Sequence, residues 1–303
     1  MAHGSRGAAN PSGMGPRGPG FRSGFVALLG RPNVGKSTLL NAIVGSKVSI
    51  VSDKVQTTRH QVRGVLERPG AQVVFVDTPG IHKPRTLLGE RTNESATSSI
   101  GDVDIPVLVL DASQEIGRGD KFIASRLPPS AFVVLNKTDQ VSSTTVLTRL
   151  GIAGLLGFSE YFPVSARTGE GVLALIEALV ARLPEGPAYF PAGTVSDAPE
   201  VFAVAELVRE QLLSRVTEEV PHSITCRVVE WEQRSGKGPF VRCEIVVERD
   251  SQKPIVIGRK GAVLKEVGIA VRAQLPPGAY LELFVRVDKE WQRRPAALDR
   301  LGF

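Results

Sequence analysis

Short apolar runs alternate with amphipathic segments over the first two thirds of the chain. The runs have the length of buried parallel strands and lie at 25–29, 72–77, 106–111, 131–135 and 161–164. The spacing of apolar residues predicts helices at 38–44, 87–100, 119–127, 144–156 and 171–183, the last with a core-facing stripe of Leu173, Ile176, Leu179 and Val180. Residues 60–67 alternate weakly, which predicts an antiparallel edge strand. Strands alternating with helices indicate a doubly wound α/β fold with a mostly parallel sheet.

After about residue 183 both the strand-type and the helix-type spacing of apolar residues break off, and a second set of predicted elements begins near residue 199. Prolines and glycines crowd the stretch from 184 to 194, so we interpret 186–199 as a linker between domains at 24–185 and 200–303. The second domain is predicted to be a smaller α+β unit. Its expected elements are a helix from 199, strands at 223–231 and 240–248, a helix reaching about 275 and a strand at 280–287.

Length, charge and cysteine content restrict the class of protein that the sequence can encode. The chain has 303 residues, enough for two domains, and no apolar run long enough to span a membrane or resemble a secretion signal. The net charge is +6, and half of it comes from three arginines in residues 1–23. We predict that these residues form a disordered tail, and the alternative is a basic arm that touches RNA. The total charge therefore says little about nucleic acid. Cys226 and Cys243 are predicted to be buried thiols in a reducing compartment, and the four histidines show no zinc spacing.

Residues 30–37 read Gly-Arg-Pro-Asn-Val-Gly-Lys-Ser and lie between a predicted strand and a predicted helix. In this context the pattern G-x-x-x-x-G-K-S is typical of a phosphate-binding loop. Gly30 and Gly35 allow the backbone to curl so that its N–H groups face anionic oxygens. Lys36 is expected to reach the terminal phosphates, and the Ser37 hydroxyl is expected to hold Mg²⁺. The other predicted phosphate-loop residues are Asn33, Val34 and Thr38.

Three more predicted strands end in polar motifs. These motifs are Asp77-Thr78-Pro79-Gly80, Asn136-Lys137-Thr138-Asp139 and Ser165-Ala166-Arg167. Because ligands of such sheets bind at the carboxyl ends of the strands, the motifs should meet at one site. Together with the phosphate loop, they resemble the motifs of the translation-factor-like GTPases.

The resemblance implies a role for each motif. Asp77 would hold Mg²⁺ through water, and the Gly80 N–H would meet the γ-phosphate. Asp139 would accept two hydrogen bonds from guanine, a donor pair that adenine lacks. Asn136 would brace the loops, and the Lys137 stem would cover the base. The last motif supplies the Ala166 N–H for the guanine oxygen, flanked by Ser165 and Arg167.

Residues 55–61 contain a candidate switch. Thr58 is expected to close over Mg²⁺ and the γ-phosphate, and Thr57 is the alternative. Both threonines could instead be edge-strand residues. The catalytic candidates are therefore Lys36, Thr58 and Gly80. Ile81 occupies the position where many GTPases place a water-orienting glutamine, so hydrolysis should be slow without help. Asn33 resembles the asparagine that holds K⁺ in GTPases of this branch.

The pattern G-x-x-G occurs five times, and only the one at Gly258–Gly261 has an informative context. An apolar stretch precedes it, two cations fill it and an amphipathic helix follows. It resembles the loop with which KH domains clamp single-stranded RNA, and the order of elements resembles the prokaryotic (type II) KH fold. The alternative is a helix–turn–helix packing joint. The predicted RNA-binding residues are Ile257, Gly258, Arg259, Lys260, Gly261 and Ala262.

A GTPase domain followed by one KH domain resembles the Era family of bacterial GTPases, from about Ser23 to Phe303. The resemblance implies a cytoplasmic, monomeric ribosome-assembly factor that hydrolyses GTP to GDP and phosphate. It further implies binding to the 3′ end of 16S rRNA on the small (30S) ribosomal subunit, gated by nucleotide state. Peripheral membrane association stays open. Two other functions fit the sequence: an RNA-binding assembly protein with a weak GTPase, and a regulatory GTPase whose second domain binds protein.

Overall fold

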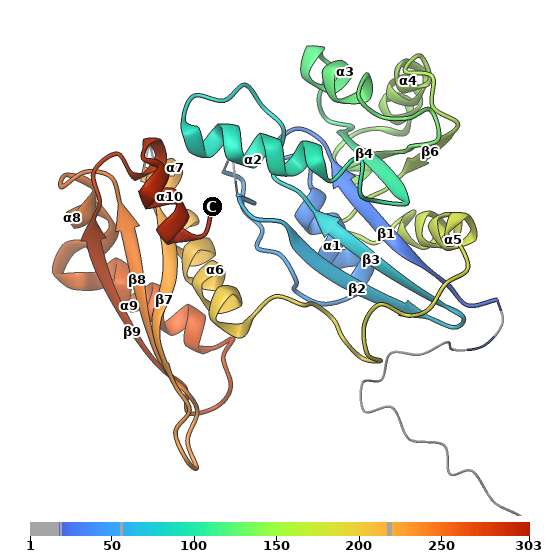
Figure 1. Ribbon diagram of the computed structural model, residues 1–303. Coiled ribbons are helices and arrows are strands. Elements are labelled where there is room, and N and C mark those ends of the chain that lie inside the picture. The colour runs from blue at the N-terminus through green and yellow to red at the C-terminus, as the bar shows by residue number, and fades with distance from the viewer. Residues whose placement is uncertain (1–17, 19, 55–56, 217–219) are drawn as a thin grey trace, which may run out of the picture.

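The computed structural model describes residues 18, 20–54, 57–216 and 220–303. Most of the predicted tail at 1–23 lies outside these residues. The described chain forms two units joined by the segment before α6 (Figure 1). The first strand begins at Arg22, two residues before the predicted domain boundary, and the Arg22 guanidinium donates to the Leu183 carbonyl at 2.6 Å.

The first unit is a six-stranded sheet in the order β2-β3-β1-β4-β5-β6, in which only β2 runs antiparallel to its neighbour. Its strands are β1 (Arg22–Leu29), β2 (Val62–Arg68), β3 (Ala71–Asp77), β4 (Ile105–Asp111), β5 (Phe132–Asn136) and β6 (Glu160–Pro163). Its helices are α1 (Lys36–Val44), α2 (Leu87–Ser98), α3 (Arg118–Ala124), α4 (Ser143–Gly154) and α5 (Val172–Arg182). One core packs α1 and α5 on one face of the sheet, and a second core packs α2, α3 and α4 on the other. The doubly wound fold and the antiparallel edge strand are confirmed.

The predicted stripe on α5 was partly wrong. Leu173 is 58% exposed, whereas Leu175 is fully buried with Val172, Ile176 and Leu179. Nearly every position of this helix is apolar, so the 3.6-residue period fits several faces. Packing on the sheet selects the face.

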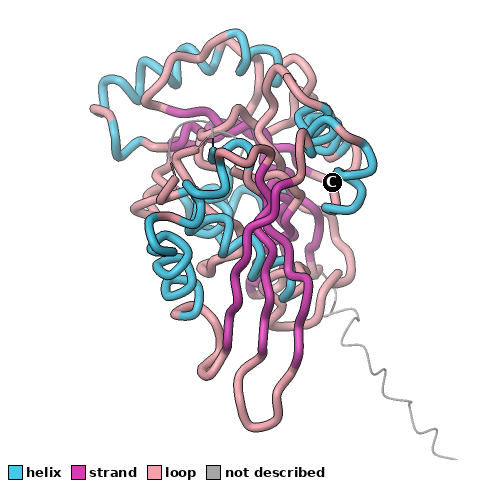
Figure 2. The backbone as a smooth tube through the Cα atoms, turned by 90° about the vertical axis from the view of Figure 1, so that its left-hand side faces the viewer, coloured by secondary structure: helices cyan, strands magenta, loops and turns pink. Residues whose placement is uncertain are grey.

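The second unit has a three-stranded sheet of β7 (Thr225–Glu232), β8 (Phe240–Val247) and β9 (Tyr280–Val287). Strand β8 pairs antiparallel with β7 and parallel with β9, and Figure 2 shows the three strands side by side. The helices are α6 (Glu200–Leu213), α7 (Val220–Ser223), α8 (Gln252–Ile257), α9 (Ala262–Arg272) and α10 (Pro295–Leu301). Helices α6 and α9 share one core with the sheet. The smaller α+β unit is therefore confirmed.

Three short helices were not predicted. The apolar stretch before Gly258 is part of α8, for which no helix was predicted, and α7 and α10 were also missed. Each has seven residues or fewer, which is too short for a clear helical period. Cys226 and Cys243 are buried and free, as predicted.

Candidate functional site

The phosphate loop joins β1 to α1 and depends on its two glycines. Gly35 has a φ of 95°, and a Cβ there would lie 2.3 Å from the Asn136 amide nitrogen. A Cβ on Gly30 would lie 2.5 Å from the Val109 carbonyl oxygen. The Asn136 amide donates to the Val34 carbonyl at 2.9 Å, so the end of β5 supports the loop. The loop thus has the close approaches that only glycine permits.

Lys36 lies inside this loop. Its ammonium donates to the Gly30 and Arg31 carbonyls at 3.2 and 2.9 Å. Burial lowers the pKa of Lys36 to about 8, while the nearby Asp77 acts in the opposite direction. An anionic phosphate next to the ammonium would raise this pKa and favour the charged form. The loop therefore presents a desolvated cation that lacks a full counter-charge.

Three hydroxyl groups converge on the Asp77 carboxylate. Ser37, Ser49 and Thr58 lie with their hydroxyl oxygens 2.6, 2.9 and 3.3 Å from Asp77 Oδ2, and Thr58 Oγ1 is 2.9 Å from Ser37 Oγ. Asp77 Oδ1 is buried without a partner. Burial raises the pKa of Asp77, and a dication would reverse that effect. A set of hard oxygen donors with an unpaired carboxylate oxygen fits Mg²⁺.

The geometry separates the two candidate switch threonines. The Thr57 hydroxyl donates to the Lys54 carbonyl at 2.7 Å, away from Asp77, while the Thr58 hydroxyl faces Ser37. The structure therefore places Thr58 at the candidate magnesium site. Ser49 was missed, because it precedes the predicted switch and lies in no motif.

The candidate base site lies where β5 and β6 end. The Asn136 Oδ1 atom accepts from the Ala166 N–H at 3.0 Å, and the Ser165 hydroxyl donates to Asp139 Oδ1 at 2.7 Å. Arg167 forms an ion pair with Asp139 at 2.9 Å. The two predicted motifs are therefore joined into one arrangement around a nearly buried carboxylate.

Lys137 connects the base site to the phosphate loop. It has a φ of 66°, and its ammonium lies 2.6 Å from both the Asn33 carbonyl and Asp111 Oδ2. Asp111 was not predicted as a site residue. It terminates β4, so the strand-end rule that selected Asp77 could have found it.

Asn33 and Gly80 lie next to the phosphate loop. The Asn33 amide donates to the Asp53 carbonyl at 2.7 Å, which connects the loop to the switch. A Cβ on Gly80 would come within 2.6 Å of the Pro32 nitrogen, so this contact also requires glycine. Ile81 is buried in the core, so no side chain there can orient a water molecule.

Most of the predicted phosphate and magnesium residues line one pocket of about 440 Å³. Its lining includes Asn33, Gly35, Lys36, Ser37, Thr38, Thr58, Gly80 and Lys137.

The six predicted RNA-binding residues connect α8 to α9. Gly258 and Gly261 have φ values of 75° and 80°, and Lys260 has a φ of 53°. A Cβ on Gly258 would lie 2.5 Å from Val263 Cγ2, so this turn needs glycine. The Arg259 and Lys260 side chains are exposed. The loop thus offers two cations beside a closely approachable backbone.

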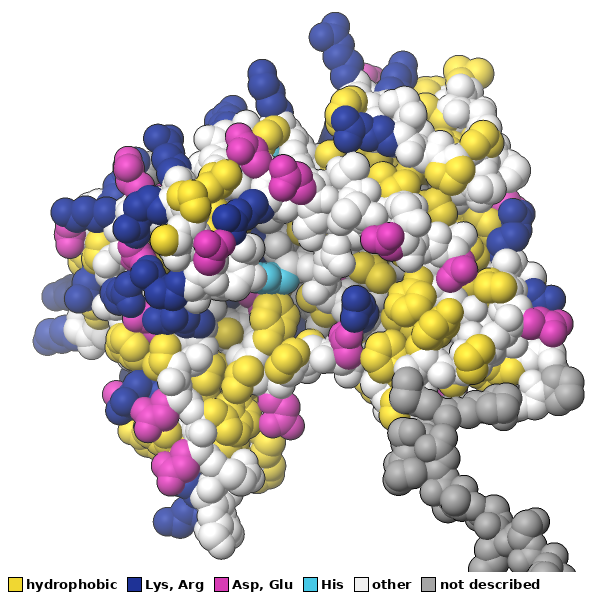
Figure 3. Space-filling model, in the orientation of Figure 1, with side chains coloured by type: hydrophobic (Ala, Val, Ile, Leu, Met, Phe, Trp, Pro, Cys, Tyr) yellow, Lys and Arg dark blue, Asp and Glu magenta, His cyan; other side chains and the backbone are white. Residues whose placement is uncertain are grey.

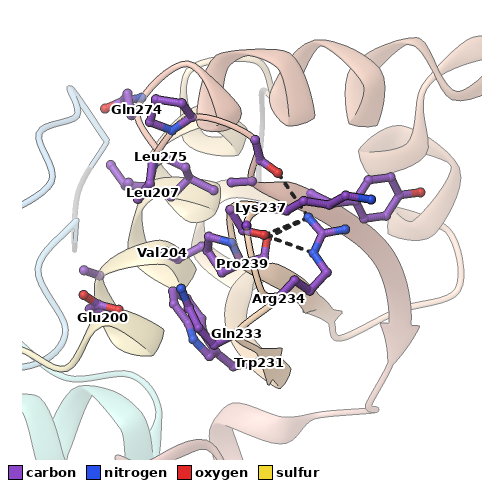
Figure 4. Close-up of a pocket in the computed structure, with 18 of the residues that line it drawn as sticks. Glu200, Val204, Leu207, Trp231, Gln233, Arg234, Lys237, Pro239, Gln274 and Leu275 are labelled. Atoms are coloured by element: carbon purple, nitrogen blue, oxygen red, sulfur yellow. Dashed lines mark hydrogen bonds between the residues drawn. The ribbon is translucent and has the colours of Figure 1, made fainter.

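A larger hollow than the nucleotide pocket lies elsewhere in the described part of the chain. It is a cleft of about 1390 Å³ between α6, the β7–β8 turn and the turn before β9 (Figure 4). Trp231 and Leu275 contribute apolar surface, while the Arg234 guanidinium is held by the Gly238 and Gly278 carbonyls at 2.9 and 3.1 Å. None of the predicted site residues lines this cleft.

In the described part of the chain, none of the helices combines the length and the apolar composition needed to cross a bilayer.

Comparison with known proteins agrees with the two units. The family model described as a 50S ribosome-binding GTPase matches residues 25–137, and the KH domain model matches residues 219–292. The chain is 48% identical to the GTPase Era of Mycobacterium leprae (strain TN) over 297 residues, covering 93% of this chain and 99% of that one. It is 44% identical to the GTPase Era of Nocardioides sp. (strain ATCC BAA-499 / JS614) over 310 residues, covering 96% and 99%.

Two solved structures cover 93% of this chain and 99% of their own, each at 36% identity. One is a substituted Era from Aquifex aeolicus bound to GDP·AlF₄⁻, with a TM-score of 0.88. The other is Era in complex with MgGDPNP and nucleotides 1506–1542 of 16S ribosomal RNA, with a TM-score of 0.89. The chain therefore belongs to the Era family of GTPases, with a GTPase domain followed by a KH domain.

Proposed function

We propose that this GTPase binds the single-stranded 3′ end of 16S rRNA and acts as a cytoplasmic, monomeric assembly factor for the small ribosomal subunit, with nucleotide state gating RNA binding. The observation that carries the proposal is the direct contact between the switch segment (residues 47–60) and the KH domain. Arg59, next to the switch threonine, donates to the Ile224 carbonyl of the KH domain at 2.7 Å. This contact supports the proposal that a change in the switch reaches the RNA-binding unit.

Nucleotide binding follows from the charges around the phosphate loop. Lys36 would contact the β- and γ-phosphates, and the Gly80 N–H would meet the γ-phosphate. Ser37, Thr58 and Asp77 would hold Mg²⁺, which supplies charge neutralisation of the phosphate oxygens. Asp139 would select guanine by accepting its two donors. Loss of the γ-phosphate would release Thr58 and Gly80 together.

RNA binding is supported by the loop between α8 and α9. Its glycines let the backbone approach phosphates, and Arg259 and Lys260 supply exposed positive charge. Figure 3 shows many Lys and Arg side chains gathered over the KH domain. The solved relative at 36% identity carries 16S rRNA nucleotides. A short single strand is therefore the ligand that we propose.

We further propose that K⁺ assists hydrolysis. The Asn33 amide and the Asp53 carbonyl lie together at the phosphate loop, and turning the amide would place two oxygens side by side for a cation. A cation there would stabilise the negative charge that develops on the transferred phosphoryl group, as an arginine finger does in other GTPases. At fixed ionic strength, we expect GTP turnover at least about tenfold higher in KCl than in NaCl. Asn33→Ala should remove this difference. Equal turnover of the unaltered chain in both salts would refute K⁺ assistance.

The gating proposal is tested by the affinity of the full chain for an oligonucleotide copying the 3′ end of 16S rRNA. We expect binding at least about fivefold tighter with a non-hydrolysable GTP analogue than with GDP, the usual lower bound for coupled sites. Salt must be fixed, because phosphate contacts are salt-sensitive. A scrambled oligonucleotide of equal length is the control. Equal affinity in both nucleotide states would contradict gating, and no binding at all would contradict the RNA assignment.

A further inference from the structure

The KH domain holds the switch segment at several points along its described length. Glu206, Arg209 and Glu210 follow one another at helical spacing on a single face of α6. Arg209 and Glu210 contact the switch segment, while Glu206 accepts from the Arg209 guanidinium at 2.8 Å. Figure 1 shows α6 on the side of the KH domain that faces the GTPase domain. These side chains are therefore well placed to contact a mobile element of the nucleotide site.

Both neighbours of Thr58 are attached to the KH domain. The Arg209 guanidinium donates to the Thr57 carbonyl, across 152 positions in the sequence. The Arg59 guanidinium donates to the Ile224 and His222 carbonyls at 2.7 and 2.8 Å. Between these two contacts, the Thr58 hydroxyl faces Ser37 and Asp77. The switch threonine is thus fixed from both sides by arginines that bridge the domains.

The burial of both arginines makes this arrangement costly to change. Arg59 is 4% exposed and Arg209 is 1% exposed. Burial and the neighbouring Arg209 lower the pKa of Arg59 to about 9. A buried guanidinium that loses its hydrogen-bond partners is strongly destabilised. A switch segment that moves must therefore carry Arg59 out of the KH domain, or move the KH domain with it.

Glu210 provides a second attachment nearer the start of the segment. One of its oxygens binds the Lys47 ammonium, and the other accepts from the Val51 N–H at 3.0 Å. Lys47 also donates to Gln274, which follows α9, at 2.9 Å. Helix α9 packs on α6 and begins directly after the Gly258–Gly261 loop. Packed contacts therefore run from the switch to the RNA-binding loop.

We propose that Arg59 and Arg209 are positioning residues that hold Thr58 at the magnesium site and transmit the loss of the γ-phosphate to the KH domain. This inference rests on the nucleotide gating proposed above and assigns it to two residues. Coupling between sites is reciprocal, so the KH orientation that keeps these contacts also favours a filled magnesium site. The KH domain thereby completes the GTPase site of its own chain.

The test replaces Arg209 in the full-length chain. In Arg209→Ala, we expect kcat for GTP to fall about ten- to a hundredfold, because Thr58 is no longer held in position. GDP affinity should stay within about twofold, because the GDP state does not need Thr58. The ratio of oligonucleotide affinities with the GTP analogue and with GDP should fall to near one. Arg209→Lys should recover part of both effects, because its ammonium can still donate to the Thr57 carbonyl.

Arg63→Ala is the matched control. Arg63 lies in β2 and pairs with Asp197 of the segment leading to α6 at 3.0 Å, so it joins the GTPase domain to the interdomain linker without touching the switch segment. We expect it to keep kcat and the affinity ratio. A melting curve for each variant establishes that it is folded. Arg209→Ala leaves the Glu206 carboxylate without its arginine partner, which could prevent the variant from folding. In that case the double variant Glu206→Gln/Arg209→Gln removes both charges together, and its kcat and its ratio of oligonucleotide affinities are measured instead.

The outcomes separate this inference from the function on which it rests. An affinity ratio of one in the unaltered chain refutes nucleotide gating itself, and the transmission through Arg59 and Arg209 with it. A gated unaltered chain together with an unchanged kcat and ratio in folded Arg209→Ala overturns the role of the arginines alone. A loss in Arg209→Ala equalled by Arg63→Ala also overturns it, because any weakened boundary would then suffice.

Discussion

Replacing Asp139 with asparagine is expected to lower GTP affinity about 10²- to 10⁴-fold, because the negative charge and one of the two hydrogen bonds to guanine are lost. Guanine presents two donors, N1–H and the exocyclic amine, to the two carboxylate oxygens. An asparagine amide offers one acceptor and one donor, so its NH₂ would face the amine of guanine. Xanthine carries a carbonyl in place of that amine. The same variant should therefore gain affinity for xanthosine triphosphate by a comparable factor.

The structure indicates that the exchange can be accommodated. The Ser165 hydroxyl can still donate to the retained amide oxygen, and Arg167 is largely exposed and can turn away. The measurement is the dissociation constant for each nucleotide. Asp250→Asn is the control, because its carboxylate is 79% exposed and Asp250 does not line the nucleotide pocket. Unchanged GTP affinity in the Asp139 variant would remove Asp139 from the base site.

The double variant Arg259→Asp/Lys260→Asp is expected to weaken oligonucleotide binding at least about 10²-fold. It changes the local charge by about four units at the loop that should approach the phosphates. Both side chains are exposed, and aspartate tolerates the left-handed conformation of Lys260 better than most residues. The KH domain should therefore fold. GTP hydrolysis without RNA should be unchanged, since the loop lies outside the nucleotide pocket.

A matched control distinguishes this loop from general electrostatics. Lys121→Asp/Arg126→Asp makes the same change in net charge at exposed positions in and just after α3 of the GTPase domain. We expect it to retain binding to within about threefold at physiological salt. Equal losses in the two double variants would indicate long-range charge alone. Retained binding by Arg259→Asp/Lys260→Asp would favour the regulatory GTPase whose second domain binds protein.

Much of the candidate site was predicted from the sequence because its motifs are local. The phosphate loop requires glycines and a lysine at fixed spacing, and these can be identified without knowing what packs around them. Asp77, Asn136 and Ser165 were found because each lies at the carboxyl end of an apolar strand, where the topology of a parallel sheet brings side chains together. The fold class followed from the same alternation.

Other features depended on packing. The sequence favoured Thr58 by its place before Arg59 but left Thr57 as the alternative, and the direction of each hydroxyl places Thr58 beside Asp77. Helix α5 is apolar almost all round, so contact with the sheet selected Leu175 over Leu173. Helix α8 is too short to show a period. In each case, several conformations satisfy the local pattern and tertiary contacts select one.

The sequence by itself therefore determined the two domains, the phosphate and guanine motifs and the glycine loop, because short-range patterns encode them. The tertiary structure alone decided how the two domains contact each other. Arg59 contacts Ile224 across 165 positions, and Arg209 contacts Thr57 across 152. Arg209 lies in no motif, and Arg59 lies in the candidate switch but has no predicted role there, so each looks like an ordinary cation in the sequence. Their roles arise from burial between two surfaces, and that burial exists only once both domains have folded and packed together.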